Sequence, residues 1–529
     1  MKVHRNLKRN RWGVERLEDR RMLAGNVYVA NDGGALVITG DSAANVFTLT
    51  QTAANTFKVT GSGTTVHGTN PISGIYNGIF IDMTQGGNDV VTLKNVNIQG
   101  QSDGISLGVL LGNGNNTLVL TGVTTELACG IVGGSKVNAI TITQSFFGYD
   151  LSIEGGNSTD AVTITKTTVD GGLFVSLCNG TNAFTMSSVA VTKADPPCSP
   201  YGDVPYGFES LNYLPFIDCG ADIFGGSGTD VDTLSGVSIS CLTQINTYQG
   251  NDVVTIVNSS FGDAPTCKYS CWDDTSGLCI ETGVGNDVVT MTSTTVYGFL
   301  QIDTSGDICC PCTGESTDLS YSSGKDGNDV VTLVKVNVLQ SQESVICCEC
   351  GDSGTESGDN VEADNTQWGC CDFCALEEGM LLIYTGNQTD VVTLTSVNIA
   401  AETSICTTDF SSLDGTDVVT ITNSNFNYDN QCVGSCCCLA YCVPAGLEIN
   451  TGAATDVVTL SKVNVVGESS ICTGDSNDVV TVNALVADYI FINMDGGTHD
   501  VLTIVNSSSP SIPTFLGVDT LVQSHNHFG

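Results

Sequence analysis

One acidic stretch recurs along this 529-residue chain and carries its clearest chemistry. It reads GGNDVVTLKNVNI from Gly86, GNDVVTIVNSSF from Gly250, GNDVVTMTSTTV from Gly285 and GNDVVTLVKVNV from Gly327. Carboxylate and turn-carbonyl oxygens are ligands that calcium prefers, so the repeated aspartate is a candidate metal ligand. We predict a weak calcium-binding edge on the surface, formed by Asp230, Asp252, Asp287, Asp329, Asp390, Asp417, Asp456, Asp478 and Asp500.

A structural role competes with calcium at the same position. Earlier units place Asp89, Asn116, Asn138, Asp160 and Asn182 there. Both residue types accept a hydrogen bond from a backbone N–H two residues on, so either one caps a turn. Stacked carboxylates repel by about 1 kcal/mol per neighbouring pair even in a water-like dielectric, and asparagine would avoid that cost. Because the later units use aspartate without exception, calcium binding remains an alternative explanation to turn capping.

Cysteines are the second group with possible chemistry, because the chain has 24 of them. Most lie in segments inserted between repeat units, where disulfides commonly fasten the loops of exported proteins. The disulfide candidates are Cys198, Cys219, Cys267, Cys271, Cys279, Cys309, Cys310, Cys312, Cys347, Cys348, Cys350, Cys370, Cys371, Cys374, Cys432, Cys436, Cys437, Cys438 and Cys442. Zinc bound by Cys347, Cys350, Cys371 and Cys374 is the alternative, since their spacing is close to that of a zinc ribbon.

Catalytic arrangements are sparse. The five histidines form no Ser-His-Asp or Cys-His arrangement that the sequence can support. A polysaccharide hydrolase needs two carboxylates on a groove. Asp273 with Asp274, or Asp303 with Asp307, are the only candidates, and acidic pairs in loops are usually solvated. We assign no catalytic and no cofactor-binding residue.

The repeat predicts the elements that hold these residues. Successive unit-opening Asp or Asn residues are most often 22 residues apart. In the first unit Val91 and Leu93 alternate with Val90 and Thr92. This period of two indicates strands with one buried face, and three such strands per step make one coil of a parallel β-helix. We predict an all-β fold, a single parallel β-helix solenoid, with Cys-rich loops inserted at about 194–220, 262–282, 304–326, 340–378 and 428–446.

Two further positions follow from this register. Asp232 would face inward where other units have Val or Ile, so either its coil is irregular or its carboxyl has a partner. Threonine recurs on the outward side, as at Thr290 and Thr332. An ice-binding array and simple β-propensity on an exposed face both fit that column.

The coil resembles the pectate-lyase-like β-helix superfamily, a resemblance that implies a right-handed coil and raises carbohydrate chemistry. Lyases of that kind use an arginine base, and this chain has no arginine after Arg21. Residues 283–289, GVGNDVV, are similar to part of the nonapeptide of calcium-binding RTX β-rolls. That family uses two nine-residue halves per coil, so its paired calcium cage does not transfer to a coil with one such turn.

Charge separates the start of the chain from the rest. The whole chain has 17 basic and 57 acidic residues, for a net charge of -40, and an acidic body of this kind repels nucleic acid. Residues 15–24, ERLEDRRMLA, resemble the LEPR-XLL motif of exported planctomycete proteins, with Asp19 in place of proline. No apolar run approaches the 18 or so residues of a membrane span. We divide the chain into a basic export leader at 1–25, the β-helix at 26–514 and a C-terminal tail at 515–529.

Together these features favour a secreted or cell-surface protein that is structural or adhesive and not an enzyme. A rigid rod would present disulfide-fastened loops to other cell-envelope proteins or to surface glycans. The insertion between Asp329 and Asp390, the longest, is the expected contact surface. A carbohydrate-active enzyme or a glycan-binding module is the alternative. The sequence leaves open the ligand, the disulfide pairing, the oligomeric state and whether the leader is cleaved.

Overall fold

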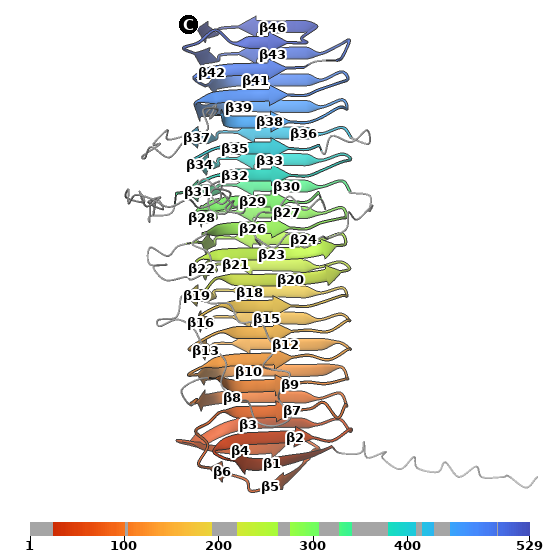
Figure 1. Ribbon diagram of the computed structural model, residues 1–529, viewed down its shortest axis with the longest axis vertical. Helices are drawn as coiled ribbons and strands as arrows, with labels where there is room; N and C mark the ends of the chain where they lie inside the picture. The colour runs from red at the N-terminus through yellow and green to blue at the C-terminus, as the bar shows by residue number, and fades with distance from the viewer. Residues whose placement is uncertain are drawn as a thin grey trace, which may run out of the picture.

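Parallel strands stack along the entire described part of the chain. This computed structural model describes residues 25–100, 104–192, 219–262, 276–305, 327–340, 379–408, 415–427, 445–494 and 496–529. Sheet A has 18 strands, and the remaining strands form a second sheet, sheet B. Figure 1 shows the strands rising in chain order from β7 to β46, and no helix occurs in the ranges given. The predicted all-β parallel solenoid is confirmed, while its right-handed sense stays a prediction.

Each coil has one strand of sheet A, one long strand of sheet B and, in most coils, a short strand of sheet B. The N-terminal strands are β1 (Asn26–Asp32), β2 (Ala35–Gly40), β3 (Val46–Ala53), β4 (Thr56–Gly61), β5 (Thr65–Gly68) and β6 (Ile72–Ser73). The sheet A strands of the coils are β7 (Ile79–Asp82), β9 (Ile105–Leu110), β11 (Ala128–Val132), β14 (Leu151–Glu154), β17 (Leu173–Ser176), β20 (Ala221–Ser227), β23 (Leu242–Gln249), β26 (Gly277–Glu281), β29 (Phe299–Asp303), β32 (Leu381–Tyr384), β35 (Thr403–Cys406), β38 (Ala445–Asn450), β40 (Glu468–Cys472), β42 (Tyr489–Asn493) and β45 (Thr514–Leu516).

Sheet B supplies the other two sides of the coil. Its long strands are β8 (Val90–Ile98), β10 (Asn116–Thr125), β12 (Asn138–Thr143), β15 (Ala161–Thr165), β18 (Ala183–Ser187), β21 (Val231–Ser235), β24 (Val253–Val257), β27 (Val288–Thr292), β30 (Val330–Val334), β33 (Val391–Thr395), β36 (Val418–Thr422), β39 (Val457–Val466), β41 (Val479–Val486), β43 (Val501–Val505) and β46 (Thr520–Ser524). Its short strands are β13 (Phe146–Phe147), β16 (Thr168–Asp170), β19 (Ala190–Thr192), β22 (Ser238–Ile239), β25 (Ser260–Phe261), β28 (Thr295–Tyr297), β31 (Asn337–Leu339), β34 (Asn398–Ile399), β37 (Asn425–Asn427), β44 (Ser508–Ser509) and β47 (His527–Phe528).

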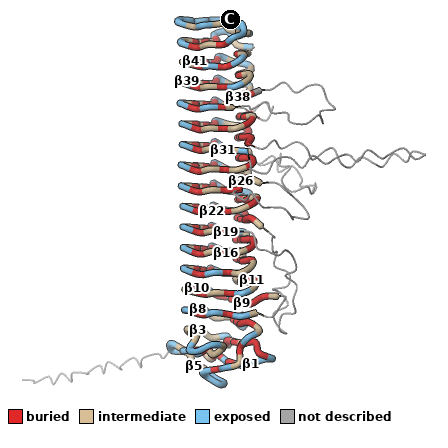
Figure 2. Tube along the Cα trace, turned by 90° about the vertical axis from the view of Figure 1, so that its left-hand side faces the viewer, coloured by how far each residue is buried: buried red, intermediate tan, exposed pale blue. Residues whose placement is uncertain are grey.

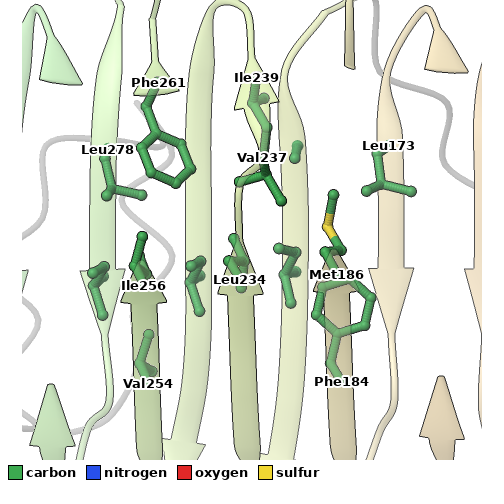
Figure 3. Close-up of a cluster of buried hydrophobic side chains, with 14 of the residues drawn as sticks. Leu173, Phe184, Met186, Leu234, Val237, Ile239, Val254, Ile256, Phe261 and Leu278 are labelled. Atoms are coloured by element: carbon green, nitrogen blue, oxygen red, sulfur yellow. The ribbon is translucent and has the colours of Figure 1, made fainter. Parts of the chain in front are cut away.

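The core is a continuous column of Val, Leu, Ile and Phe side chains. Strand β24 shows how it arises, because Val254 and Ile256 are fully buried while the alternating Val253, Thr255 and Val257 face outward. Figure 3 shows Phe184, Met186 and Leu234 from neighbouring long strands reaching the same interior. In Figure 2 the buried positions recur at matching places in successive coils. Burial of each such side chain stabilises the fold by about 1.5–3 kcal/mol, so every coil depends on its neighbours.

Asp232 is the exception in this core. It lies in β21 in register with Phe184 and Val254, and the coil shows no register shift there. Its side chain is 2% exposed, and its Oδ2 has no hydrogen-bond partner. Burial, followed by the charges of Asp230 and Asp252, raises the pKa of Asp232 to about 8. The coil is therefore regular, and it tolerates a costly carboxyl in its interior.

The N-terminal end of the stack differs from the coils above it. Strand β1 pairs antiparallel with β2, and β4 pairs antiparallel with both β3 and β6. These hairpins lie across the first coils, at the lower end in Figure 1. They cover a row of strand edges that would otherwise be open to pairing with another chain.

The structure corrects two predicted segment boundaries, that of the C-terminal tail and that of one insertion. Strands β46 and β47 pair with β43 and β44, so residues 515–529 continue the coil and are not a tail. The spacing in this coil is shorter, which hid it from a search for 22-residue steps. Strand β26 begins at Gly277, inside the segment expected to be an insertion up to residue 282. Its short apolar run, LCI, was too brief to identify from the sequence alone.

Candidate functional site

The repeated aspartates and asparagines form one hydrogen-bonded ladder along the stack. The backbone N–H of Asp252 donates to Asp287 Oδ1, and that of Asp287 donates to Asp329 Oδ1, both at 2.8 Å. The same bond joins successive coils from Asp230 up to Asp500. It continues at 3.1 Å from Asp500 to Asp519, a member that the sequence analysis missed. Each carboxylate therefore accepts from the coil before it, where turn capping within its own coil was expected.

These side chains lie inside the protein. All nine aspartates predicted as a calcium edge are at most 1% exposed, as are Asp89 and Asp160. The expected surface position is wrong because the turn folds the carboxylate beneath the backbone of the adjacent coil. Among the described residues, no group of three or more His, Cys, Asp or Glu side chains is placed to hold a metal ion. Calcium binding stays a prediction, without the exposed edge on which it was based.

The second carboxylate oxygen of each ladder aspartate, Oδ2, has different surroundings in the two parts of the stack. In the N-terminal part it meets backbone, since Gly156 N–H donates to Asp160 Oδ2 at 2.7 Å and Gly226 N–H donates to Asp230 Oδ2 at 2.9 Å. In the C-terminal part a column of buried threonines lies beside it instead. Thr407 donates its hydroxyl to Asp417 Oδ2 at 2.6 Å. The Oδ2 atoms of Asp252, Asp287 and Asp478 lie beside Thr247, Thr282 and Thr473 without a hydrogen bond of normal geometry. The column comprises Thr247, Thr282, Thr304, Thr385, Thr407, Thr451 and Thr473.

Burial controls the protonation of the ladder. It raises the pKa of Asp252 and of Asp478 to about 6, and that of Asp287 to about 7. The backbone N–H from the preceding coil and the Thr282 hydroxyl act against this rise at Asp287, and the charge of Asp252 adds to it. Burial raises the pKa of Asp417 to about 9 despite the Thr407 hydroxyl. Part of the ladder is therefore protonated near neutral pH.

The whole Gly-Asn-Asp tripeptide now has a structural reason. A Cβ on Gly285 would lie 1.4 Å from the carbonyl oxygen of Gly250, and one on Gly327 would lie 1.7 Å from that of Gly285. Only glycine permits this approach of successive backbones. The next residue forms an exposed amide ladder, in which Asn251 Oδ1 accepts from Asn286 N–H at 2.9 Å. The similarity to RTX turns thus coincides with residues that the stacking itself requires.

The cysteines divide between the coil and segments outside the described residues. Cys219 forms a disulfide with Cys241 across neighbouring coils, with 5.9 Å between their Cα atoms. Cys241 was not among the candidates, although its separation of 22 residues from Cys219 is one coil. Cys279, expected in a loop, lies buried in β26. The other candidates, including the four cysteines of the possible zinc site, lie outside the described residues.

The outward side of sheet A gathers acidic and polar side chains. Glu281 and Asp303 are in register on the neighbouring strands β26 and β29, about 4.8 Å apart along the stack. Asn246 donates its amide to Glu281 Oε2 at 2.7 Å, and Ser305 donates its hydroxyl to Asp303 Oδ1 at 2.6 Å. Asp303 was a carboxylate candidate, whereas Glu281 was missed because it stands in the segment expected to be a loop. Asp273, Asp274 and Asp307 lie outside the described residues.

Aromatic rings adjoin these carboxylates. Phe174 and Phe224 have ring centroids 5.7 Å apart, and Phe224 and Tyr248 have centroids 6.4 Å apart. Burial and then the charge of Glu281 raise the pKa of Tyr248. Asp303 is 4% exposed, while Tyr248 is 46% exposed. We refer to this area, formed by Phe174, Phe224, Tyr248, Glu281 and Asp303, as the sheet A site.

The comparisons with known proteins add no relative. No family model, no curated protein and no solved structure matches this chain. Within the described ranges, no helix is long and apolar enough to cross a membrane. Function therefore has to be argued from the chain's own geometry.

Proposed function

We propose that this protein is a non-enzymatic, extracellular or cell-surface solenoid that holds adhesive segments along one side of a rigid stack. The observation that carries the proposal is where residues are inserted between the strands. Every insertion that lengthens a coil beyond 22 residues adjoins the start or the end of a sheet A strand. None separates a long strand of sheet B from the short strand that follows it. Segments inserted into a regular scaffold commonly carry its binding function.

The partners we propose are surface glycans or other cell-envelope proteins. The sheet A site offers rings that can pack against the flat faces of sugars, together with amide and carboxylate groups that can bind hydroxyls. Export, proposed from the N-terminal motif, fits the Cys219–Cys241 disulfide, because such bonds persist in oxidising compartments. Calcium could strengthen attachment as a proposed weak ligand of the acidic surface.

The test is binding of the purified full chain to cell envelopes of the source organism and to a glycan array. Replacing Phe174, Phe224 and Tyr248 by serine should reduce binding at least tenfold if the sheet A site takes part. A matched control replaces the exposed Tyr28, Tyr76 and Ile512, which belong neither to the sheet A site nor to the long sheet B strands, by serine. Equal binding by both variants would show that the site is not the contact surface, and absence of any binding would overturn the proposal.

A polysaccharide hydrolase is the second candidate, favoured by one observation. Glu281 and Asp303 are in register on adjacent coils, so two carboxyls stand next to each other on the outward side of sheet A, as a glycosidase requires. Release of reducing sugar by the full chain, abolished by Glu281→Gln and by Asp303→Asn, would replace the adhesive proposal. We expect no turnover, because Asp303 is nearly covered and its Oδ1 is already occupied by Ser305.

A further inference from the structure

The outward side of the long sheet B strands forms a second, unlike surface, which we call the threonine face. It consists of the first, third and fifth residues of the five-residue runs that begin at Ala139, Ala161, Ala183, Val231, Val253, Val288, Val330, Val391, Val418, Val457, Val479 and Val501. The third residue is threonine in all twelve runs. Eleven consecutive parallel pairings keep these threonines in register without a shift.

This face carries no charge. Its first residues are all Ala or Val, its fifth residues are Thr, Ser, Val or Asn, and no position holds Asp, Glu, Lys or Arg. The chain nevertheless contains 57 acidic residues, and the outward positions of sheet A hold Asp222, Glu281, Asp303, Glu448 and Glu468. A general preference of strands for uncharged residues cannot explain the contrast, because both surfaces are built from strands.

The face is also uninterrupted and partly exposed. Its long strands pass to the short strands through corners of constant length, so nothing is inserted at its edge on that side. Val231 and Val479 are 39% and 38% exposed, well above the usual exposure of core valines. Eleven steps of about 4.8 Å and a width of five residues at about 3.3 Å each give roughly 850 Å². That equals the share of one partner in a standard stable interface of about 1,600 Å² in total.

We propose that the threonine face binds a second copy of this chain, face to face, in a two-fold symmetric dimer. Two uncharged sheet surfaces can pack about 10 Å apart with their Val and Thr methyl groups interdigitating, as sheets do in β-sandwiches. The outward side of sheet A carries acidic side chains, which repel between copies. The neutral face is where two such rods can approach, so added salt should strengthen the dimer.

The test measures the mass of the full chain by light scattering over a wide range of protein concentration, with and without reductant. We expect twice the chain mass of 55.0 kDa in both conditions. In small-angle X-ray scattering, the cross-section should be larger than that of a single rod while the length stays that of one rod. The double variant Thr290→Lys and Thr332→Lys should raise the dissociation constant of the dimer at least tenfold. A second pair, Thr420→Lys and Thr459→Lys, provides the same measurement if the first variant fails to fold.

The control adds the same charge on sheet A, with Ser404→Lys in β35 and Ser470→Lys in β40 at outward positions, and should leave the dimer intact. A monomer at every concentration, a dimer that reductant abolishes, a rod of doubled length, or face variants that dimerise like the native chain would each overturn the proposal. A monomer that adsorbs to ice or to an insoluble neutral polysaccharide through Thr290 and Thr332 would also overturn it and assign the face to that ligand.

Discussion

The two parts of the aspartate ladder surround the second side-chain oxygen or nitrogen of each member in different ways. From Asn116 to Asp230 the ladder mixes Asn with Asp, and backbone groups of the same turn satisfy the second side-chain atom, as Gly226 N–H does for Asp230. From Asp252 to Asp478 every member is aspartate, and a buried threonine lies beside the second oxygen, with a hydrogen bond at Asp417. The second oxygens of Asp252, Asp287 and Asp478 have no hydrogen-bond partner, and that of Asp89, before the mixed part, has none either. The mixed part therefore holds the side chain with the main chain, whereas the all-aspartate part leaves buried carboxyls that can bind a proton.

The largest expected effect is that of pH on the whole stack. The folded-state pKa values of Asp89, Asp252, Asp287 and Asp478 are raised from 3.8 to about 6 or 7, so the folded protein binds more protons than the unfolded chain. Stability from these groups is fully present below about pH 4 and is lost as the pH rises through 6 to 7. Thermal melting between pH 4 and pH 8 should show a falling melting temperature. A melting temperature that rises over this range would contradict the protonated ladder.

At the junction of the two parts, Asp232→Val should stabilise the fold. The substitution removes a buried carboxyl without a partner at Oδ2 and restores the residue type found at this position in other coils. We expect the free energy of unfolding to rise by about 3 kcal/mol at pH 8 and by less at pH 4. Denaturant titration at both pH values measures this. Val254→Ala, which removes core packing in the next coil, is the control and should destabilise at both.

Asparagine should have opposite effects in the two parts. Asp287→Asn removes a carboxyl whose pKa burial raises to about 7, and we expect a gain of about 2 kcal/mol at pH 8. Asp230→Asn places an amide N–H against the N–H of Gly226 or of Asn182, and we expect a loss of about 1 kcal/mol. Denaturant titration at pH 8 decides. The same sign for both variants would show that the two parts do not differ.

A smaller effect should follow from the threonine column. Thr282→Val keeps the shape of the side chain but removes the hydroxyl that lowers the pKa of Asp287. We expect a loss of about 1 kcal/mol at pH 8, and little change in the Asp287→Asn background. A double-mutant cycle measured by denaturant unfolding tests this coupling. Full additivity would mean that the hydroxyl does not act through the carboxyl.

Calcium should have the smallest effect on the ladder. The aspartates are buried, and Oδ1 already accepts a backbone N–H, so a calcium ion has no exposed set of oxygens to bind there. Melting curves of the native chain in millimolar calcium and in chelator should coincide. A clear rise with calcium that Asp287→Asn removes would restore the calcium-binding edge predicted from the sequence.

The sequence predicted the coil because its periodicity is local. Alternation such as that of Val91 and Leu93 specifies which side of a strand is buried, and the 22-residue step specifies what stacks on what. The role of the aspartate was not predictable in the same way, since its hydrogen-bond donor belongs to another coil 22 or more residues away. A partial signal was present in the threonine five residues before Asp252, Asp287, Asp390, Asp456 and Asp478, although Asp89 also has a threonine at that distance. Glu281 and Asp303 could be paired only through the register of β26 and β29.

The ladder also has a direction, since each of its N–H groups donates to the carboxylate or amide oxygen of the following coil. Every coil therefore presents the same donor at one end and the same acceptor at the other, and any coil is an acceptable neighbour for any other. Loss or tandem duplication of a 22-residue segment would rejoin the ladder, the glycine column and the apolar core without a mismatch. A gene encoding such a chain can lengthen or shorten the rod by whole coils, while a partial coil would place an aspartate against an apolar strand.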